Sequence, residues 1–279
     1  MNNVIEKRVY IFDLDGTLYE GSDHFDFYAD RLLADVPEKF KEAFQQDYIN
    51  MKDGRHNVMI GKAYDVIRDI VITVDPMTLQ AIEAKTWEGK VRPDMLSYYG
   101  DSPLTFDFKN IVAIGDGWWL PFACAKHYGV KDCYPHYLET KAFMVSDSFN
   151  LQKIFGLKTF LKELKQNHPL VLMTNSDKED VLRLLNELDL KGIFDHIISS
   201  AKKPTLTTQL FEALKKQYEL PFQQLVSVGD NFINEIAPAL MLDMKAVYIS
   251  SHPHQTGHAN LCHVQQISEW INSDWEIYK

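Results

Sequence analysis

Hydrophobic and polar positions alternate through the second half of the chain in a way that predicts a repeated strand–helix arrangement. Short apolar runs of strand length recur, and apolar residues at helical spacing lie between them. Strands are expected at residues 170–173, 197–198, 225–228 and 246–249. The helices before and between them are expected around residues 157–164, 176–188 and 210–214. Nearly continuous apolar strands separated by helices are typical of a parallel sheet that is covered on both faces.

Another strand is expected near the N-terminus, and two carboxylates follow it. Residues 9–12 are apolar, and Asp13, Asp15 and Gly16 come next. If extended backbone continues, residues i and i+2 share a face, so Asp13 and Asp15 would point the same way. Two close carboxylates raise each other's proton affinity unless a cation lies between them. The pair suits Mg²⁺, and it suits chemistry in which one carboxylate attacks and the other carries a proton. The alternative is a polar Asp-Gly turn.

The segment between this strand and the strand–helix alternation has a different character. Residues 19–148 contain long helical patterns and many aromatic side chains, and they interrupt the alternation directly after the first strand. We therefore predict a doubly wound α/β core of residues 1–18 and 149–279, with an inserted, mainly α-helical domain. Residues 111–117 look like a strand before an Asp-Gly turn, and we interpret them as a turn within the insertion rather than a second carboxylate site.

Composition narrows the class of protein. The net charge of −10 disfavours a dedicated nucleic-acid binder, which usually carries a basic face. No apolar run approaches the ~18 residues of a membrane span, and the N-terminus lacks a signal-peptide layout, so we expect a cytoplasmic protein without a membrane partner. The three cysteines lack disulfide or zinc spacing and are expected to be free thiols. Histidines crowd residues 252–263, also without a zinc pattern.

Polar residues recur just after the expected strands. Open parallel sheets bind ligands outside the carboxyl ends of their strands. The hydroxyl of Thr174, the amide of Asn175 and the start of the following helix would donate hydrogen bonds to a phosphate there. Ser176 begins an S-x-x-E capping pattern for that helix. Lys203 follows the 197–198 strand, and each of these signals alone also fits an ordinary turn, helix cap or surface lysine.

Taken in order, these motifs resemble those of the haloacid dehalogenase-like superfamily of hydrolases. Residues 13–17 match the first motif of the family and Thr174 matches the second. Lys203, with the proline that follows it, matches the third, and Gly229-Asp230 matches the start of the acidic fourth. The insertion at residues 19–148 lies where the family places a type C1 cap domain. The resemblance implies an active site between the core and this cap.

The resemblance also implies a role for each motif residue. Asp13 would attack phosphorus and form an aspartyl-phosphate. Asp15 would protonate the leaving oxygen and then deprotonate the hydrolytic water. Mg²⁺ would be held by the Asp13 carboxylate, the Asp15 backbone carbonyl and Asp230. Thr174 and Lys203 would stabilise the non-bridging oxygens of the phosphoryl group.

The fourth motif departs from the family pattern. The family commonly has a second Asp four or five residues after the first, where this chain has Asn234 and Glu235. Glu235 is expected near the metal, as a ligand or through a water, and Asn175 is expected to contact the substrate together with Thr174 and Lys203.

The function implied by the resemblance is a Mg²⁺-dependent phosphatase for a small phosphorylated metabolite, acting as a monomer or homodimer. Asp15 favours phosphoryl transfer over dehalogenation, because a halide leaves without a proton and family dehalogenases lack this second Asp. A phosphomutase acting on a phosphosugar remains an alternative at this point. A non-catalytic binding or regulatory module on the same scaffold is a third possibility, which the intact motifs disfavour.

Overall fold

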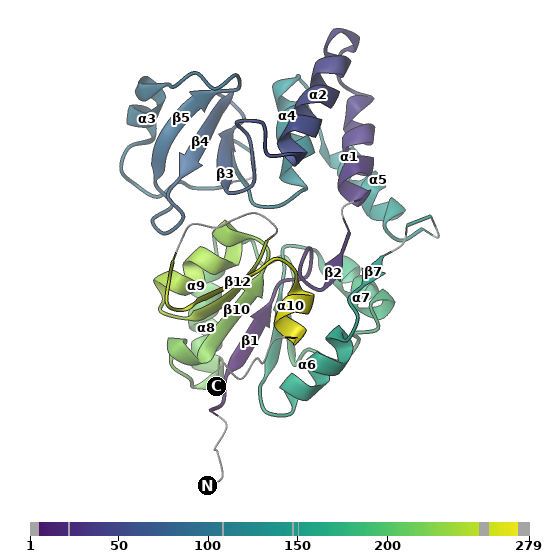
Figure 1. Ribbon diagram of the computed structural model, residues 1–279, viewed down its shortest axis with the longest axis vertical. Coiled ribbons are helices and arrows are strands. Elements are labelled where there is room, and N and C mark those ends of the chain that lie inside the picture. Colours follow the sequence, from purple (N-terminus) through teal and green to yellow (C-terminus); the bar gives the residue numbers. More distant parts are fainter. Residues whose placement is uncertain are drawn as a thin grey trace. The chain divides into compact units, whose positions relative to one another are not determined.

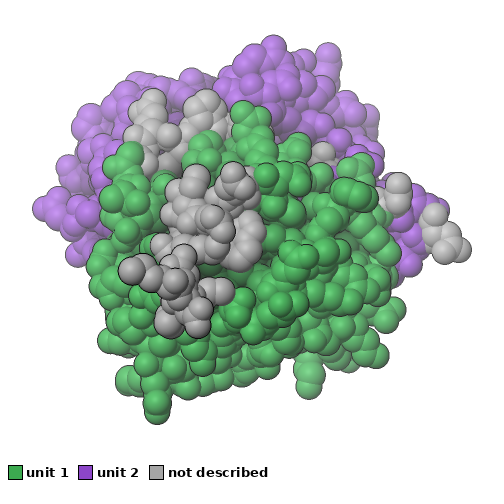
Figure 2. All heavy atoms as spheres, turned by 60° about the horizontal axis from the view of Figure 1, so that its bottom comes forward, with its two compact units in different colours: residues 1–20, 151–279 green, residues 21–150 purple. Residues whose placement is uncertain are grey.

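The computed structural model divides the chain into two compact units. It describes residues 6–21, 23–107, 109–146, 148–149, 151–250 and 257–272. Unit 1 comprises residues 1–20 and 151–279, and unit 2 comprises residues 21–150. Figure 2 colours the two units separately. Residues 21–150 form a unit of their own, and Tyr19 and Glu20 belong to unit 1.

Unit 1 is built on a six-stranded sheet in the order β12-β11-β10-β1-β8-β9 (Figure 1). Every pair of neighbouring strands in this sheet is parallel. The strands are β1 (Val9–Phe12), β8 (Leu170–Met173), β9 (His196–Ile198), β10 (Leu225–Gly229), β11 (Lys245–Ile249) and β12 (Leu261–Val264). The predicted doubly wound α/β core is confirmed, and β1 lies in the middle of its sheet.

Helices follow most of these strands and cover the sheet. They are α6 (Leu157–Lys165), α7 (Lys178–Glu187), α8 (Thr207–Tyr218), η2 (Phe222–Gln224), η3 (Phe232–Ile236), α9 (Ala237–Met241) and α10 (Ile267–Asn272). All four residues of β1 are buried, which requires cover on both faces of the sheet. On one face, Tyr10 and Phe12 contact Trp270 of α10, and Phe160 of α6 packs against the same indole ring.

A two-stranded antiparallel ribbon joins the segments on either side of the insertion. It pairs β2 (Tyr19–Glu20) with β7 (Gln152–Lys153), and Tyr19 lies opposite Lys153. Unit 2 begins directly after β2 and ends at residue 150, two positions before β7 begins. The pairing explains why Tyr19 and Glu20 belong to unit 1, although the sequence analysis placed them in the insertion.

Unit 2 contains a group of helices and a four-stranded antiparallel sheet in the order β5-β4-β3-β6. Its helices are α1 (Asp23–Leu33), η1 (Glu38–Phe40), α2 (Lys41–Lys52), α3 (Pro93–Tyr99), α4 (Trp119–His127) and α5 (Tyr134–Phe143). Its strands are β3 (Lys62–Asp65), β4 (Ile70–Val74), β5 (Ala81–Thr86) and β6 (Ile111–Ile114). The unit has more helix than strand, but the sequence analysis did not predict its sheet.

The composition of these strands explains the omission. β5 reads Ala-Ile-Glu-Ala-Lys-Thr, and Ala, Glu and Lys are depleted in strands generally. β4, Ile-Val-Ile-Thr-Val, and β6, Ile-Val-Ala-Ile, have a clear strand composition, and the segment of β6 was interpreted above as part of a turn within the insertion. Strand β12 was missed for a related reason, because its Leu-Cys-His-Val is only partly buried at the edge of the core sheet and lacks an apolar run.

Three smaller findings bear on the sequence analysis. Cys124, Cys133 and Cys262 are free thiols, as expected. Trp118 packs against the rings of Phe25, Tyr28 and other aromatic residues within unit 2. Among the described residues, no helix has the length and apolar character needed to cross a bilayer.

Candidate active site

The carboxyl ends of the three central core strands bring the motif residues together. Asp13 follows β1, Thr174 follows β8 and Asp230 follows β10. The backbone N–H of Asp13 donates to the carbonyl of Val228 at 2.9 Å, so the pairing between β1 and β10 continues to the nucleophile position. This pairing places Asp13 beside the start of the fourth motif, at the edge of the sheet where open parallel sheets bind ligands.

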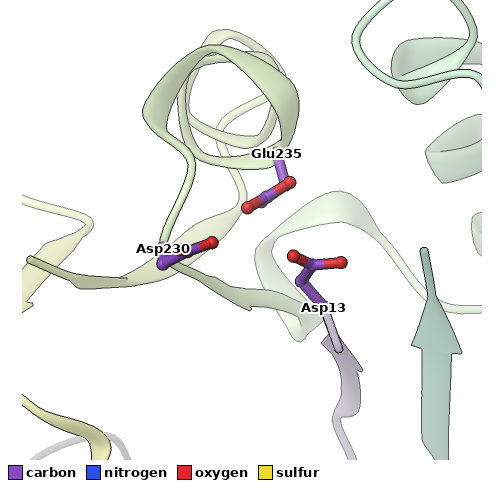
Figure 3. A group of neighbouring side chains, drawn as sticks. All are labelled: Asp13, Asp230 and Glu235. Atoms are coloured by element: carbon purple, nitrogen blue, oxygen red, sulfur yellow. The ribbon is translucent and has the colours of Figure 1, made fainter. Parts of the chain in front are cut away.

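Asp13, Asp230 and Glu235 form a compact cluster of carboxylates. One oxygen from each lies within 4.8 Å of the others, and Figure 3 shows the three groups facing a common point. Two glycines make room for this approach. A β-carbon on Gly16 would fall 2.0 Å from Asp230 Oδ2, and one on Gly229 would fall 2.4 Å from Glu235 Oε1. No other residue type fits at these two positions without moving a carboxylate.

Lys203 lies between two of these carboxylates. Its ammonium donates to Asp13 Oδ1 and to Glu235 Oε2, each at 2.8 Å, and the side chain is 2% exposed. Lys202 is exposed, so the structure brings Lys203 rather than its neighbour to the nucleophile position. The other oxygen of Glu235 accepts the backbone N–H of Asn231 at 2.9 Å. Glu235 therefore orients the lysine and the fourth-motif loop as well as facing the cluster.

The site carries more negative than positive charge. Among the described residues here, the carboxylates of Asp13, Asp15, Asp230 and Glu235 accompany the ammonium of Lys203. Burial raises the pKa of Asp13, and the Asp15 charge raises it further, although the Lys203 ammonium acts in the opposite direction. Burial and the Asp13 charge raise the pKa of Glu235 to about 7. Burial alone would lower the pKa of Lys203. The negative charges of Asp13 and Glu235 have the larger combined effect, so the pKa is raised.

Asp15 is oriented by two hydroxyl groups that the sequence analysis did not single out for this purpose. The Tyr19 hydroxyl donates to Asp15 Oδ1 at 2.6 Å, and the Ser176 hydroxyl donates to Asp15 Oδ2 at 2.8 Å. Burial raises the pKa of Tyr19 well above its usual value, and the Asp15 charge adds to the effect, so the phenol keeps its proton and remains a donor. No sequence pattern marks Tyr19, since its contact depends on how the loop after β1 folds back.

The interpretation of Ser176 as the helix cap is wrong. Asp177 caps α7, and its carboxylate accepts the backbone N–H groups of Glu179 and Asp180. The cap is displaced by one residue from the S-x-x-E pattern, because Asp is at least as good an N-cap as Ser. The displacement leaves the Ser176 hydroxyl available for Asp15.

Thr174 and Asn175 have different surroundings. Thr174 is buried, and its hydroxyl oxygen accepts the backbone N–H of Ser176 at 3.1 Å, which leaves the hydroxyl proton available to a ligand. The side-chain amide of Asn175 pairs with the backbone of Lys203, accepting its N–H at 2.7 Å and donating to its carbonyl at 3.0 Å. Asn175 thus holds the loop that carries Lys203, and its contact with a substrate stays a prediction.

The donor set fits a hard divalent cation. Carboxylate oxygens are the ligands that Mg²⁺ prefers, and the cluster of Asp13, Asp230 and Glu235 supplies three of them within one small volume. The surplus of negative charge would also be reduced by such an ion. The Asp15 carboxylate lies outside this cluster and is held by its two hydroxyls, and a metal contact from its backbone carbonyl stays a prediction.

The histidine-rich stretch adds no site in the described residues. His252 and His254 lie outside the residues that the structure describes. His263 lies on β12, where its Nε2 is 2.8 Å from the carbonyl of Ser250. His258 Nδ1 accepts the backbone N–H of Asn260. Both described histidines therefore have ordinary structural partners.

Comparisons with known proteins point to one family. The family profile described as haloacid dehalogenase-like hydrolase matches residues 124–249. This match covers the Thr174, Lys203 and Asp230 motifs but not Asp13. A comparison with curated protein sequences found no match at all.

Solved structures of similar fold include a haloacid dehalogenase-like family hydrolase from Xanthomonas campestris. It is 13% identical, with a TM-score of 0.51, and the alignment covers 97% of this chain and 95% of that one. The HAD-hydrolase YfnB from Bacillus subtilis, described as bound to magnesium, is 14% identical with a TM-score of 0.49 over 98% and 99% of the two chains. The L-2-haloacid dehalogenase RSc1362 is 14% identical with a TM-score of 0.48 over 95% and 96%. At such low identity, the first match shows a shared fold alone.

Proposed function

Because this chain belongs to the haloacid dehalogenase-like hydrolases, we propose that it is a Mg²⁺-dependent phosphatase of a small phosphorylated metabolite. The observation that carries the proposal is the arrangement of Asp13 and Asp15. Asp13 lies against Lys203 and the carboxylate cluster, and the Asp15 carboxylate is separately held by two hydroxyls. The two carboxylates have different surroundings, as expected for a nucleophile and a proton carrier.

The alternative within the same family is a dehalogenase. A halide is a stable anion and leaves carbon without a proton, so a carboxylic acid beside the leaving group has no task in that step. An ester oxygen leaves phosphorus as an alkoxide, which needs a proton as the bond breaks. Asp15 therefore favours phosphate ester hydrolysis over carbon–halogen cleavage.

The reaction would proceed in two steps. In the first, an Asp13 carboxylate oxygen forms a bond to phosphorus, the ester P–O bond breaks, and the leaving oxygen takes a proton from Asp15. In the second, Asp15 takes a proton from a water whose oxygen attacks phosphorus. The bond between phosphorus and Asp13 then breaks, inorganic phosphate leaves, and both carboxyl groups return to their starting states.

The other residues would stabilise the transferring group. The Lys203 ammonium is anchored by Asp13 and Glu235, so it can face the phosphoryl oxygens without reorganising. Thr174 can donate its hydroxyl proton to one of the same oxygens. Mg²⁺ bound by Asp13, Asp230 and Glu235 would supply positive charge that offsets the negative charge of nucleophile and substrate.

The test is release of inorganic phosphate from a panel of phosphorylated sugars, nucleotides and small acids, with and without Mg²⁺. Wild type should release phosphate in a Mg²⁺-dependent manner, and Asp13→Asn should lose at least ~10³-fold in kcat because the amide is a poor nucleophile. Asp177→Asn is the matched control, since it makes the same Asp-to-Asn change at a helix cap and should retain activity.

Three other outcomes would contradict the proposal. Release of halide from 2-haloacids without Mg²⁺ would identify a dehalogenase. Movement of the phosphoryl group between positions of a sugar, with no net release of phosphate, would identify a phosphomutase. No reaction on any compound, in protein whose folding is verified by circular dichroism, would favour a binding module.

A further inference from the structure

Both oxygens of the Asp15 carboxylate accept a hydrogen bond from a hydroxyl group, and the two hydroxyls come from distant parts of the sequence. Tyr19 lies on β2, four residues after Asp15, whereas Ser176 lies in the loop between β8 and α7. A carboxyl group held at both oxygens cannot rotate about its terminal torsion without breaking at least one of these bonds. Its orientation is therefore determined by the positions of Tyr19 and Ser176.

The two hydroxyls are themselves firmly placed. The backbone N–H of Ser176 donates to Thr174 Oγ1 at 3.1 Å, and its carbonyl accepts the backbone N–H of Ser200 at 2.9 Å. Tyr19 is 1% exposed, and its backbone pairs with Lys153 in the β2–β7 ribbon. These contacts keep both side chains in place around Asp15 before any substrate arrives.

We infer that Tyr19 and Ser176 are positioning residues that aim the Asp15 carboxyl group at the leaving oxygen of the substrate. The inference rests on the proposed phosphatase function. Proton transfer requires donor and acceptor oxygens within about 2.6–3.2 Å, and a misplacement of about 1 Å can lower a rate ~10²-fold. Hydroxyl groups suit this task in both steps, because the carboxyl oxygens can accept their protons whether or not Asp15 is protonated, which leaves the acid proton for the leaving oxygen.

Positioning of Asp15 predicts a dependence of the rate on the leaving group, which a merely structural role of Tyr19 and Ser176 would not produce. A general acid accelerates ester cleavage in proportion to the basicity of the leaving group, so alkyl phosphates depend on it strongly and 2,4-dinitrophenyl phosphate hardly at all. The ratio kcat/KM reports only the steps up to departure of the leaving group, in which Asp15 acts as the acid. Misaiming Asp15 should therefore lower kcat/KM for an alkyl ester and spare the aryl ester.

The experiment compares glycerol 2-phosphate with 2,4-dinitrophenyl phosphate in the full-length protein with Mg²⁺. We expect Tyr19→Phe and Ser176→Ala each to lower kcat/KM for the alkyl ester about tenfold or more, and the double variant more still. The aryl ester should change less than about threefold. Asp15→Asn should give the same pattern more strongly. Tyr10→Phe, a buried tyrosine of β1 away from Asp15, is the matched control and should leave the ratio of the two esters unchanged.

Equal losses on both esters in the Tyr19 and Ser176 variants would overturn the inference, as would no loss on either. The two single variants are independent, so one that folds normally by circular dichroism and thermal melting is sufficient for the comparison. If wild type hydrolyses neither ester nor any metabolite, the proposed function itself has failed. A different outcome separates the two ideas. If wild type is active and Asp13→Asn is inactive, the phosphatase function stands. If Tyr19→Phe and Ser176→Ala then leave the ratio of kcat/KM for the two esters unchanged, only the positioning role is wrong.

Discussion

Gly16 and Asp230 approach so closely that a single added carbon cannot fit between them. A β-carbon on Gly16 would lie 2.0 Å from Asp230 Oδ2, and Gly16 also has a positive φ of 72°. The first and fourth motifs are thus packed directly against each other at the edge of the sheet. This contact explains why glycine follows Asp15, beyond the general preference for Asp-Gly in turns.

We predict that Gly16→Ala abolishes most activity by displacing the Asp230 carboxylate. Hydrolysis should fall at least ~10²-fold, because a displacement of about 1 Å in a reacting site has that effect. Gly192→Ala is the control, since Gly192 has a similar φ of 77° but nothing within 4 Å of its added β-carbon. It should cost about 1–2 kcal/mol in urea unfolding and leave kcat unchanged. Equal activity of the two variants would contradict the steric argument.

Lys203 should be needed for stability as well as for reaction. Lys203→Met leaves the Asp13 and Glu235 carboxylates buried without their shared cation. Loss of one partner of a buried ion pair costs about 3–5 kcal/mol, which denaturant unfolding in EDTA can measure. Adding Glu235→Gln removes one of the unpaired charges and should recover part of the loss. If the loss in the free energy of unfolding of the double variant equals the sum of the losses in the two single variants, Lys203 and Glu235 are not coupled.

The stability of the metal-free protein should depend on pH through Glu235. Its pKa is raised from 4.5 to about 7, by burial and by the Asp13 charge, so between these values the folded state binds more protons than the unfolded state. The free energy of unfolding should therefore fall as pH rises from about 4.5 to 7, by up to about 3 kcal/mol. Urea unfolding in EDTA at several pH values measures this change in the free energy of unfolding with pH.

Glu235→Gln is the control for this pH dependence, because glutamine has no proton to exchange. The slope between pH 4.5 and 7 should be smaller in this variant than in wild type. Added Mg²⁺ should also reduce the fall in wild type, since a cation offsets the charge that burial makes costly. An unchanged slope in Glu235→Gln would show that another group titrates.

Asp177 should contribute to stability without contributing to catalysis. Asp177→Ala removes the acceptor for two backbone N–H groups at the start of α7 and should cost about 1 kcal/mol in thermal or urea unfolding. Asp177→Asn should keep most of this stability, because asparagine caps as well as aspartate does. Neither variant should change kcat, and a large loss of activity in both would mean that the cap also orients Ser176.

Much of the core was predictable because its buried strands are short apolar runs in the sequence. The buried strands β1, β8 and β10 are apolar runs that the sequence reveals directly, and the motif residues follow each of them in order. The carboxyl ends of parallel strands meet at one edge of a sheet, so the gathering of Asp13, Thr174 and Asp230 follows from the order alone. Strands β12 and β5 lack such an apolar run. They are only partly buried, so polar residues occur in them beside apolar ones.

What the sequence determined by itself is the α/β fold of the core, whereas the roles of the motif residues stay predictions. What only the tertiary structure decided is which partners those residues have. Tyr19 and Ser176 meet at Asp15 because a ribbon and a strand-end loop converge there, and Asp177 displaces Ser176 from the cap. Spacing in the sequence encodes strands and helices, whereas a contact such as that between Asp15 and Ser176, 161 positions apart, depends on the packing of the whole unit.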